Sequence, residues 1–414
     1  MLVDLLIRHA HLLTPTGSSP LAGEAQRDLI SIKNATIAAA DGHVVYAGPE
    51  PDGGIAVARE GHTIDAAGAT VVPGFVDAHT HAAFAGDRRS ELQRRLAGAT
   101  YAEIAAEGGG ILATVGATRS ASERELAAQT RARLDEMLAC GTTTAEVKSG
   151  YGLETAAELK MLRCIRGLDA AHPIDLVPTF LGAHEVAPEY RGRREEYVRV
   201  VVEEMIPAVA AAGLARWCDV FCETGVFTPE DSRAILRAGQ AVGLQARIHA
   251  DELAASGGSQ VAADVGARSA DHLIHVPADG IAAMAQAGVI ATLLPCAAFY
   301  LKLGRFAPAR ALVAAGVPVA LATDVNPGGG FSPSMPFAMA LACFGMQMTF
   351  EEALAAATLN AACSLDRGDR AGSVEVGKPM DVVIVEGGAV NLIRVGAPAI
   401  RAVVKAGKVL HAHR

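Results

Sequence analysis

The chain has 414 residues, of which 51% are hydrophobic and 20% charged, so it is long and apolar enough to bury a sizeable core. Its formal net charge is −9 and only 4% of its residues are aromatic, which argues against a protein that binds nucleic acid by its phosphates or stacks on its bases. An anionic substrate would therefore need its own local Arg or Lys. The seven cysteines are odd in number and form no CxxC pair, which suits free thiols in a reducing cytoplasm.

Both ends of the chain contain short strand-like runs separated by turn signals. These runs are residues 5–13, 30–40, 43–48, 381–388 and 400–410. We predict that residues 1–70 and 366–414 form one small β-sandwich domain built from both termini. The first fifteen residues have the pattern of a strand and not of a signal peptide, and no apolar stretch is long enough to span a membrane. We expect a cytoplasmic protein.

The middle of the chain, residues 71–365, alternates apolar β-type runs with amphipathic stretches. The runs that we predict to be strands are residues 71–81, 142–150, 174–184, 217–225, 244–252, 269–275, 289–296 and 317–326. Helix periodicity marks residues 154–168 and 228–242, the second of which starts with a good capping residue, Thr228. Eight such units predict a (β/α)8 barrel, whose active site lies at the carboxyl ends of the strands. A doubly wound open sheet is the alternative, but its usual GxGxxG turn is missing.

Five of the 13 histidines lie at predicted strand ends, namely His79, His81, His184, His249 and His272. Alternate side chains of a strand share a face, so His79 and His81 point the same way and suit one metal ion. His249 and Asp324 can complete the set if the sheet closes, with a position left open for a water whose pKa falls toward about 7. Taken alone, each of these residues has an ordinary alternative as a loop, core or turn residue.

Other polar residues at the same strand ends suggest roles in catalysis. Glu252, three residues beyond His249, could carry protons, although a helix-start acid is an equal alternative. His272 could stabilise a developing oxyanion. Lys148 is interpreted as a supporting ion-pair partner and not as a modified metal bridge. Arg88 could bind a substrate carboxylate, but from the residues alone a solvated charge run is the better interpretation.

Several sequence blocks resemble a known family. PGFVDAHTH at 73–81, HADE at 249–252 and the later Asp324 resemble the amidohydrolase superfamily. The blocks EVKSGYGL at 146–153, PTFLGAHEVAPEY at 178–190 and TDVNPGG at 323–329 resemble, more specifically, its imidazolonepropionase family. The resemblance extends over residues 70–380, nearly the whole of the predicted barrel.

This resemblance implies a metal-dependent hydrolase. It implies that His79, His81, His249 and Asp324 bind one Zn²⁺ or Fe³⁺ ion per chain. The residues that it implies for substrate binding are Arg88 and Tyr151 at a propionate end, together with His184, Glu252, Asn326, Gly328 and Gly329. Glu252, His272 and Asp324 would be catalytic. One departure is that Gly329 and Gly330 stand where the family commonly has Ser or Thr, so a hydroxyl contact is lost or replaced by backbone.

The implied reaction is the hydrolysis of the cyclic amide C–N bond of 4-imidazolone-5-propanoate to N-formimidoyl-L-glutamate, a step of histidine degradation, in an enzyme that forms a homodimer. One alternative is a related deaminase that acts on a guanine- or cytosine-like ring. Another is a catalytically inactive barrel that binds a partner, which the complete set of candidate metal ligands argues against.

Overall fold

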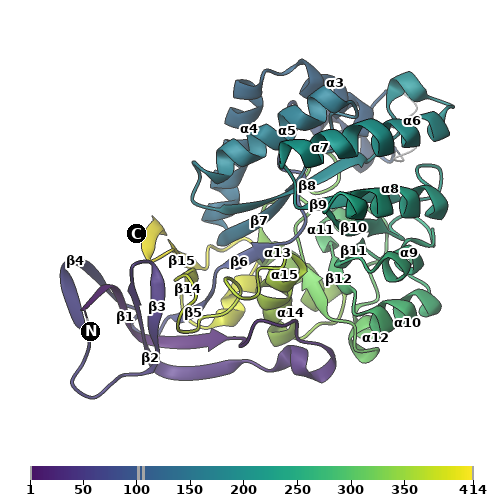
Figure 1. Cartoon of the computed structure of the whole chain (residues 1–414). Helices are drawn as coiled ribbons and strands as arrows, with labels where there is room; N and C mark the ends of the chain where they lie inside the picture. The colour runs from purple at the N-terminus through teal and green to yellow at the C-terminus, as the bar shows by residue number, and fades with distance from the viewer. Residues whose placement is uncertain (1, 100–102, 105–107, 413–414) are drawn as a thin grey trace.

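Eight parallel strands from the middle of the chain lie side by side in sequence order, as predicted (Figure 1). The computed structural model describes residues 2–99, 103–104 and 108–412. The parallel strands are β6 (Phe75–Asp77), β7 (Thr142–Lys148), β8 (Asp175–Ala183), β9 (Trp217–Cys222), β10 (Gln245–Ala250), β11 (Ser269–His272), β12 (Ile290–Leu293) and β13 (Val319–Leu321). Nearly all of their residues are buried, as expected for parallel strands that are covered on both faces.

The first and last of these strands are joined by hydrogen bonds just beyond their carboxyl ends. The carboxylate of Asp77 accepts a hydrogen bond from the backbone N–H of Thr323 at 3.0 Å and another from its hydroxyl at 2.5 Å. The backbone N–H of Asp324 donates to the carbonyl of His79 at 3.1 Å, and that of His81 donates to the carbonyl of Val325 at 3.0 Å. These bonds close the sheet, so the predicted barrel is confirmed.

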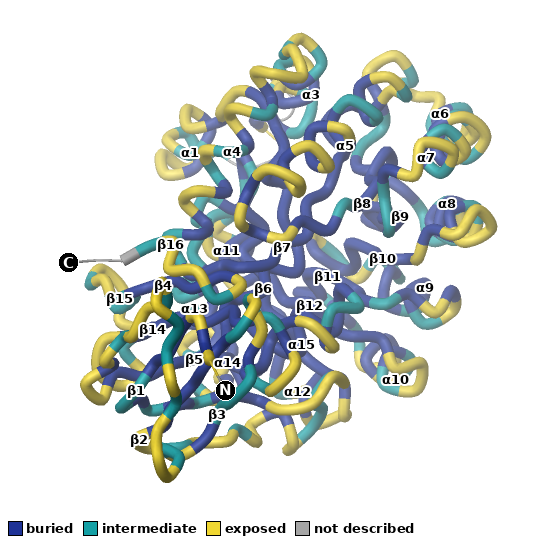
Figure 2. The backbone as a smooth tube through the Cα atoms, turned by 60° about the vertical axis from the view of Figure 1, so that its left-hand side comes forward, coloured by how far each residue is buried: buried dark blue, intermediate teal, exposed yellow. Residues whose placement is uncertain are grey.

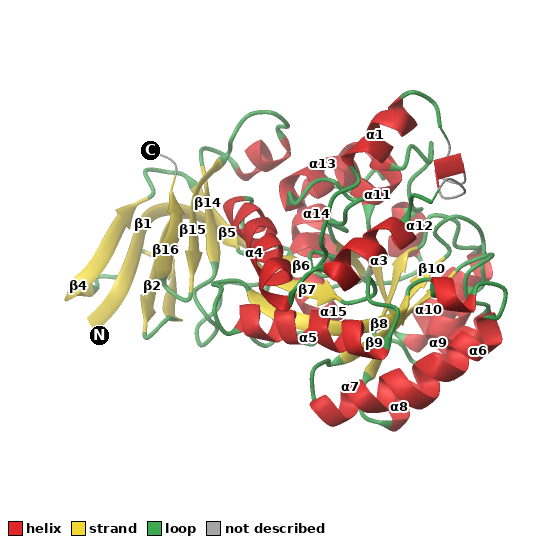
Figure 3. Cartoon of the chain, turned by 90° about the horizontal axis from the view of Figure 1, so that it is seen from above, coloured by secondary structure: helices red, strands yellow, loops and turns green. Residues whose placement is uncertain are grey.

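Helices form the outer layer of the barrel (Figure 3). The predicted helices at 154–168 and 228–242 are present, and Thr228 caps the second through the backbone N–H of Asp231. The helices around the strands are α4 (Glu123–Ala139), α5 (Thr155–Asp169), α6 (Arg194–Val200), α7 (Ile206–Ala212), α8 (Pro229–Ala241), α9 (Gly258–Val265), α10 (Ala278–Ala287), α12 (Ala309–Ala314), α14 (Phe350–Ala357) and α15 (Leu359–Ser364). Loops after the strands carry α1 (Arg89–Leu96), α3 (Ile111–Ser120), α11 (Pro295–Tyr300) and α13 (Met335–Gly345).

Strands from both ends of the chain form a second sheet beside the barrel (Figures 1 and 2). Its members are β1 (Leu2–Thr14), β2 (Ile30–Ala40), β3 (His43–Pro49), β4 (Ala56–Asp65), β5 (Thr70–Pro73), β14 (Val382–Val385), β15 (Ile400–Lys405) and β16 (Lys408–Ala412). They follow the order β16-β15-β14-β5-β1-β2-β3, with β4 also paired to β1. The termini meet where β5 pairs with β14, which confirms that both ends build this sheet.

Several predicted strands are longer than the observed ones, since β11, β12 and β13 are shorter than the predicted 269–275, 289–296 and 317–326, and the first predicted strand is divided between two sheets. Residues 71–81 do not form a single strand, because β5 belongs to the outer sheet and β6 to the barrel. The chain crosses between the sheets at Gly74, where a Cβ would lie 2.3 Å from the hydroxyl oxygen of Thr143. The division of the chain into domains at residues 70 and 366 stays a prediction. None of the helices in the described part of the chain combines the length and apolar composition that crossing a bilayer requires.

Candidate active site

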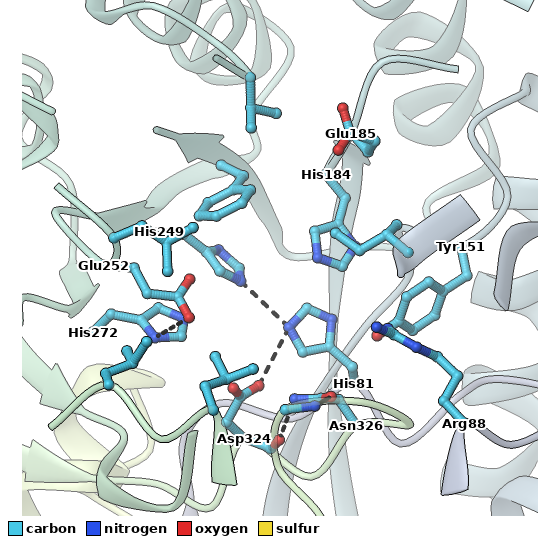
Figure 4. A pocket seen from close by; sticks show the side chains of 17 residues that line it. His81, Arg88, Tyr151, His184, Glu185, His249, Glu252, His272, Asp324 and Asn326 are labelled. Atoms are coloured by element: carbon cyan, nitrogen blue, oxygen red, sulfur yellow. Dashed lines mark hydrogen bonds and ion pairs between the residues drawn. The ribbon is translucent and has the colours of Figure 1, made fainter. Parts of the chain in front are cut away.

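The polar residues at the carboxyl ends of the barrel strands converge on one cavity (Figure 4). Seventeen residues line it, and the polar ones are His81, Arg88, Tyr151, His184, Glu185, His249, Glu252, His272, Asp324 and Asn326. They follow or end β6, β7, β8, β10, β11 and β13. The closed sheet thus brings together residues that are more than 200 positions apart in the chain, as a barrel places them.

Three of the predicted histidines form a tight cluster. The Nε2 atom of His81 lies 3.3 Å from the Nε2 atom of His79 and 3.3 Å from the Nε2 atom of His249. All three side chains are buried. Burial lowers the pKa of His79 and His81, and the positive charge of neighbouring groups lowers it further, so both rings are neutral. Neutral imidazole is the form that binds a metal ion.

Asp324 completes the cluster. Its Oδ1 atom lies 3.7 Å from Nε2 of His79 and 3.6 Å from Nε2 of His81, and it has no hydrogen-bond partner although it is buried. An unpartnered buried carboxylate oxygen is costly unless something else satisfies it. Its backbone φ is +53°, a strained value for a residue with a side chain, which the closing loop holds in place.

The donor set fits a metal ion. Donors about 2.0–2.1 Å from a tetrahedral zinc ion are about 3.3–3.4 Å apart, and the two measured N–N separations are 3.3 Å. Three imidazoles and one carboxylate are ligands of the kind that zinc and iron accept. The orphaned Oδ1 of Asp324 faces the same point as the imidazoles. His79, His81 and His249 therefore form a buried group that could hold a metal ion, and Asp324 lies beside two of them. That all four bind one ion stays a prediction.

Carboxylates behind the cluster hold two of the imidazoles in orientation. Nδ1 of His79 lies 2.7 Å from Asp271, and Nδ1 of His249 lies 3.1 Å from Asp219. Such partners fix the tautomer so that Nε2 faces the metal position. The Lys148 ammonium donates to Asp219 at 2.6 Å, which confirms its interpretation as an ion-pair residue.

The fully buried charges around Lys148 compensate one another. Glu146 also accepts from Lys148 at 2.7 Å, and Arg247 lies 3.4 Å from Asp271. The carboxylates of Asp219 and Glu146 hold the pKa of Lys148 above its usual value despite burial. Neither Asp219 nor Asp271 was predicted as a site residue, because an acid in the middle of an apolar strand gives no sign of which strand it faces.

Glu252 and His272 lie together on one side of the cluster (Figure 4). Oε1 of Glu252 is 3.5 Å from Nδ1 of His272, and both side chains are buried. Burial and the nearby charge of Glu223 raise the pKa of Glu252 to about 8. Burial lowers the pKa of His272, so its ring is neutral. This pair can hold and exchange a proton beside the metal position.

Arg88 and Tyr151 lie on the opposite side of His81 from Glu252 and His272 (Figure 4). Arg88 is 6% exposed and Glu91 is buried as well, so the interpretation as a solvated charge run is wrong for these two residues, whereas Asp87 and Arg89 are exposed. His184 stacks on His81 with ring centroids 4.8 Å apart, and its Nδ1 lies 3.0 Å from the carbonyl oxygen of Gly150. A cationic group and an aromatic hydroxyl thus face the cavity across from the proton-carrying pair.

The loop after β13 lines the cavity beside Asp324. The side-chain oxygen of Asn326 accepts from the backbone N–H of Gly328 at 2.8 Å and of Gly329 at 2.5 Å, and its amide donates to the carbonyl of Asp324 at 2.8 Å. Asn326 and Gly329 line the cavity, whereas Gly328 lies behind Arg88. Of the three residues of this loop that are predicted to contact substrate, Asn326 and Gly329 line the cavity and Gly328 does not, and the contacts themselves stay predictions.

Replacing Gly330 with alanine is expected to destabilise this loop. Its Cβ would lie 1.6 Å from the carbonyl oxygen of Asp324, which is backbone and cannot rotate away. The matched control is Gly329→Ala, whose Cβ meets nothing nearer than 3.5 Å. We expect Gly330→Ala to lose at least the roughly 1–3 kcal/mol typical of overpacking, and Gly329→Ala to lose little. Thermal unfolding of the two variants side by side checks this, and equal unfolding temperatures would contradict the steric account.

Comparisons with known proteins show the family to which the chain belongs. A family model described as the amidohydrolase family matches residues 70–411. An imidazolonepropionase of Symbiobacterium thermophilum is 50% identical over 386 residues, which cover 92% of this chain and 91% of the relative. One of Geobacillus kaustophilus is 48% identical over 419 residues, which cover 98% of this chain and 97% of the relative.

Solved structures show the same fold at lower identity. The guanine deaminase of E. coli has a TM-score of 0.71 at 16% identity and covers 99% of both chains. An adenosine deaminase of Xanthomonas campestris with bound zinc has a TM-score of 0.69 at 20% identity, covering 99% of this chain and 93% of that one. Because the family model spans most of the chain and relatives about half identical span nearly all of it, the chain belongs to the amidohydrolase family and is a hydrolase.

Proposed function

We propose that the chain hydrolyses the cyclic amide C–N bond of 4-imidazolone-5-propanoate to give N-formimidoyl-L-glutamate. The observation that carries the proposal is the layout of one cavity, with the metal site and Glu252 at one side and the buried Arg88 at the other. The metal site with Glu252 suits the amide bond of a ring, and Arg88 suits the carboxylate of a side chain on that ring. The relatives that share about half of the residues bear the name imidazolonepropionase.

Asp324, Glu252 and His272 contribute different steps of the reaction. A bound metal ion supplies Lewis-acid activation of water and of a carbonyl oxygen. Asp324 or Glu252 takes a proton as water adds to the lactam carbonyl carbon, and the neutral ring of His272 stabilises the oxyanion that develops. The C–N bond then breaks, and Glu252 returns a proton to the departing ring nitrogen. With its pKa raised to about 8, Glu252 can carry this proton near neutral pH.

Arg88 and Tyr151 orient the substrate at its other end. The guanidinium matches the planar geometry of a carboxylate, and it places a positive charge at the cavity of a chain whose net charge is −9. Asn326 and the backbone of Gly329 border the position of the ring, and His184 closes the cavity above His81. Fixing both ends holds the amide bond against the groups that act on it.

A deaminase of guanine- or cytosine-like rings is the second candidate. Solved deaminases share this fold, but at 16–20% identity they support only the assignment of the fold. A planar base carries no propionate and needs no buried Arg to bind one. Arg88 therefore favours the imidazolone substrate.

Purified protein tests the proposal directly. Incubation with 4-imidazolone-5-propanoate should abolish the absorbance of the imidazolone ring at a rate proportional to the amount of enzyme. Turnover of guanine or cytosine, with the imidazolone left intact, would instead identify a deaminase.

Replacing Arg88 with alanine is expected to raise KM and leave kcat nearly unchanged. The lost contact is a charge-assisted hydrogen bond worth about 1.5–3 kcal/mol, and the charge on the propionate barely changes between ground and transition state. The matched control is Arg89→Ala, which removes an exposed guanidinium at the next position. An Arg88→Ala enzyme with the KM of the wild type would show that the carboxylate is bound elsewhere.

The identity and number of metal ions, the oligomeric state and the cellular compartment stay predictions. We propose one Zn²⁺ or Fe³⁺ ion per chain, which elemental analysis of the purified protein would identify and count. We also propose a homodimer in the cytoplasm, and analytical ultracentrifugation would give its mass.

A further inference from the structure

We propose that Glu91 is a positioning residue that orients the guanidinium of Arg88 toward the carboxylate of the substrate. The inference rests on the proposed function, because it assigns to Glu91 a part in binding the propionate. Glu91 does not line the cavity itself, and we assign its effect on substrate binding to its contact with Arg88.

Glu91 holds Arg88 by two bonds to one oxygen. The Nε–H and an Nη2–H of Arg88 donate to Oε2 of Glu91 at 2.8 and 2.6 Å. The side chains of Arg88 and Glu91 are 6% and 9% exposed. An ion pair this deeply buried differs from a solvated i,i+3 pair on a helix, because a guanidinium taken out of water needs a carboxylate partner. The pair therefore fixes where the plane of the guanidinium points.

The other oxygen of Glu91 ties the pair to the next helix. Oε1 accepts a hydrogen bond from the backbone N–H of Gly110 at 2.9 Å, and Gly110 precedes the first residue of α3. The two carboxylate oxygens of Glu91 thus accept hydrogen bonds from different groups. Oε2 accepts from Arg88, and Oε1 accepts from the backbone at the start of α3.

The guanidinium of Arg88 also packs against the loop after β13. A Cβ at Gly328 would lie 2.4 Å from Cζ of Arg88, so the guanidinium occupies the space that a side chain there would fill. Arg95, on the same helix, donates to the carbonyl of Gly328. Arg88 is therefore held between Glu91 and the loop that carries Asn326. A guanidinium fixed before the substrate arrives loses less rotational freedom when the carboxylate binds.

A double-mutant cycle separates positioning from plain structural support. Glu91→Ala should raise KM about tenfold or more, the size of a lost charge-assisted contact, with kcat within about threefold of the wild type. In an Arg88→Ala background the same substitution should change KM less than about twofold, since no guanidinium remains to be oriented.

A second variant keeps the test valid if Glu91→Ala folds poorly. Glu91→Gln retains the volume and one acceptor for Gly110 but presents an N–H₂ group to the donors of Arg88. It should raise KM as Glu91→Ala does, while its thermal unfolding stays near that of the wild type. The matched control is Asp87→Asn, an exposed acid beside Arg88 whose contact is with the backbone N–H of Arg89, and its KM should be unchanged.

The possible results point in different directions. A rise in KM for both Glu91 variants that disappears in the Arg88→Ala background supports the inference. A normal KM for Glu91→Gln, or an equal rise in both backgrounds, overturns it while the proposed function stands. Wild-type protein that leaves the imidazolone intact overturns the proposed function and this inference with it.

Discussion

Glu252→Gln is expected to lower kcat by about 10² to 10⁴-fold, the usual contribution of a positioned acid–base group, while the metal stays bound. The substitution keeps the size of the side chain but removes its ability to take up or release a proton. Glu252 is buried, lies 3.5 Å from His272 and has its pKa raised to about 8 by burial and by Glu223. The loss should appear in kcat and not in KM, because proton transfer belongs to the transition state.

The matched control for Glu252 is Glu185, another glutamate that lines the cavity. Its carboxylate lies on the far side of His184 from the metal ligands, so Glu185→Gln makes the same chemical change away from the reacting atoms (Figure 4). We expect its kcat to stay within tenfold of the wild type. A Glu252→Gln enzyme with its full complement of metal and a near-normal kcat would refute the role, and Asp324 would then be the proton carrier.

His79→Ala is expected to abolish both metal binding and turnover. The substitution removes one of three nitrogen donors whose measured separations match a tetrahedral ion, and it leaves Asp271 without the imidazole that it orients. The remaining His81, His249 and Asp324 would hold an ion far more weakly, because affinity depends on the number and geometry of the ligands. Elemental analysis should show a fall from one metal ion per chain to near zero.

The matched control for His79 is His275→Ala. His275 lies three residues beyond His272 but outside the set that lines the cavity, with Nδ1 3.5 Å from Arg305. It should keep both the metal and kcat. Circular dichroism of the two variants should show the same secondary structure. His79→Ala protein that keeps one ion per chain and full activity would contradict the metal site.

The strand-end histidines could be predicted from the sequence because two simple regularities govern them. Side chains alternate along a strand, and parallel strands of a barrel end at one face, so His79, His81 and His249 had to converge once eight strands were recognised. Asp324 followed from the same argument. The positions of these residues along the chain were therefore enough to predict that they lie close together.

The supporting residues could not be predicted in the same way. Asp219 on β9 contacts His249 on the neighbouring strand β10, and Asp271 on β11 contacts His79, which follows β6. Which imidazole each acid faces is a property of the closed sheet and not of either segment. The pairing of Arg88 with Glu91 was visible in the sequence, but its burial was not. An i,i+3 ion pair has the same spacing on a solvated helix as under a loop.

The point at which the chain crosses between the two sheets also could not be predicted from the sequence. Residues 70–77 form a largely apolar run in the sequence, and only the pairing of β5 and β6 with different sheets shows where the chain leaves one sheet for the other. Strand β4 was not predicted, because most of its residues are partly or fully exposed and give no apolar run.

Product analysis by mass spectrometry tests the central claim most directly, that this cavity opens a cyclic amide by hydrolysis. With 4-imidazolone-5-propanoate as substrate, the product should be heavier by the mass of one water, should match N-formimidoyl-L-glutamate in its fragments, and should form without release of ammonia. In ¹⁸O-labelled water the label should appear in the new carboxylate. Release of ammonia, or recovery of the imidazolone unchanged from metal-loaded protein, would contradict the account.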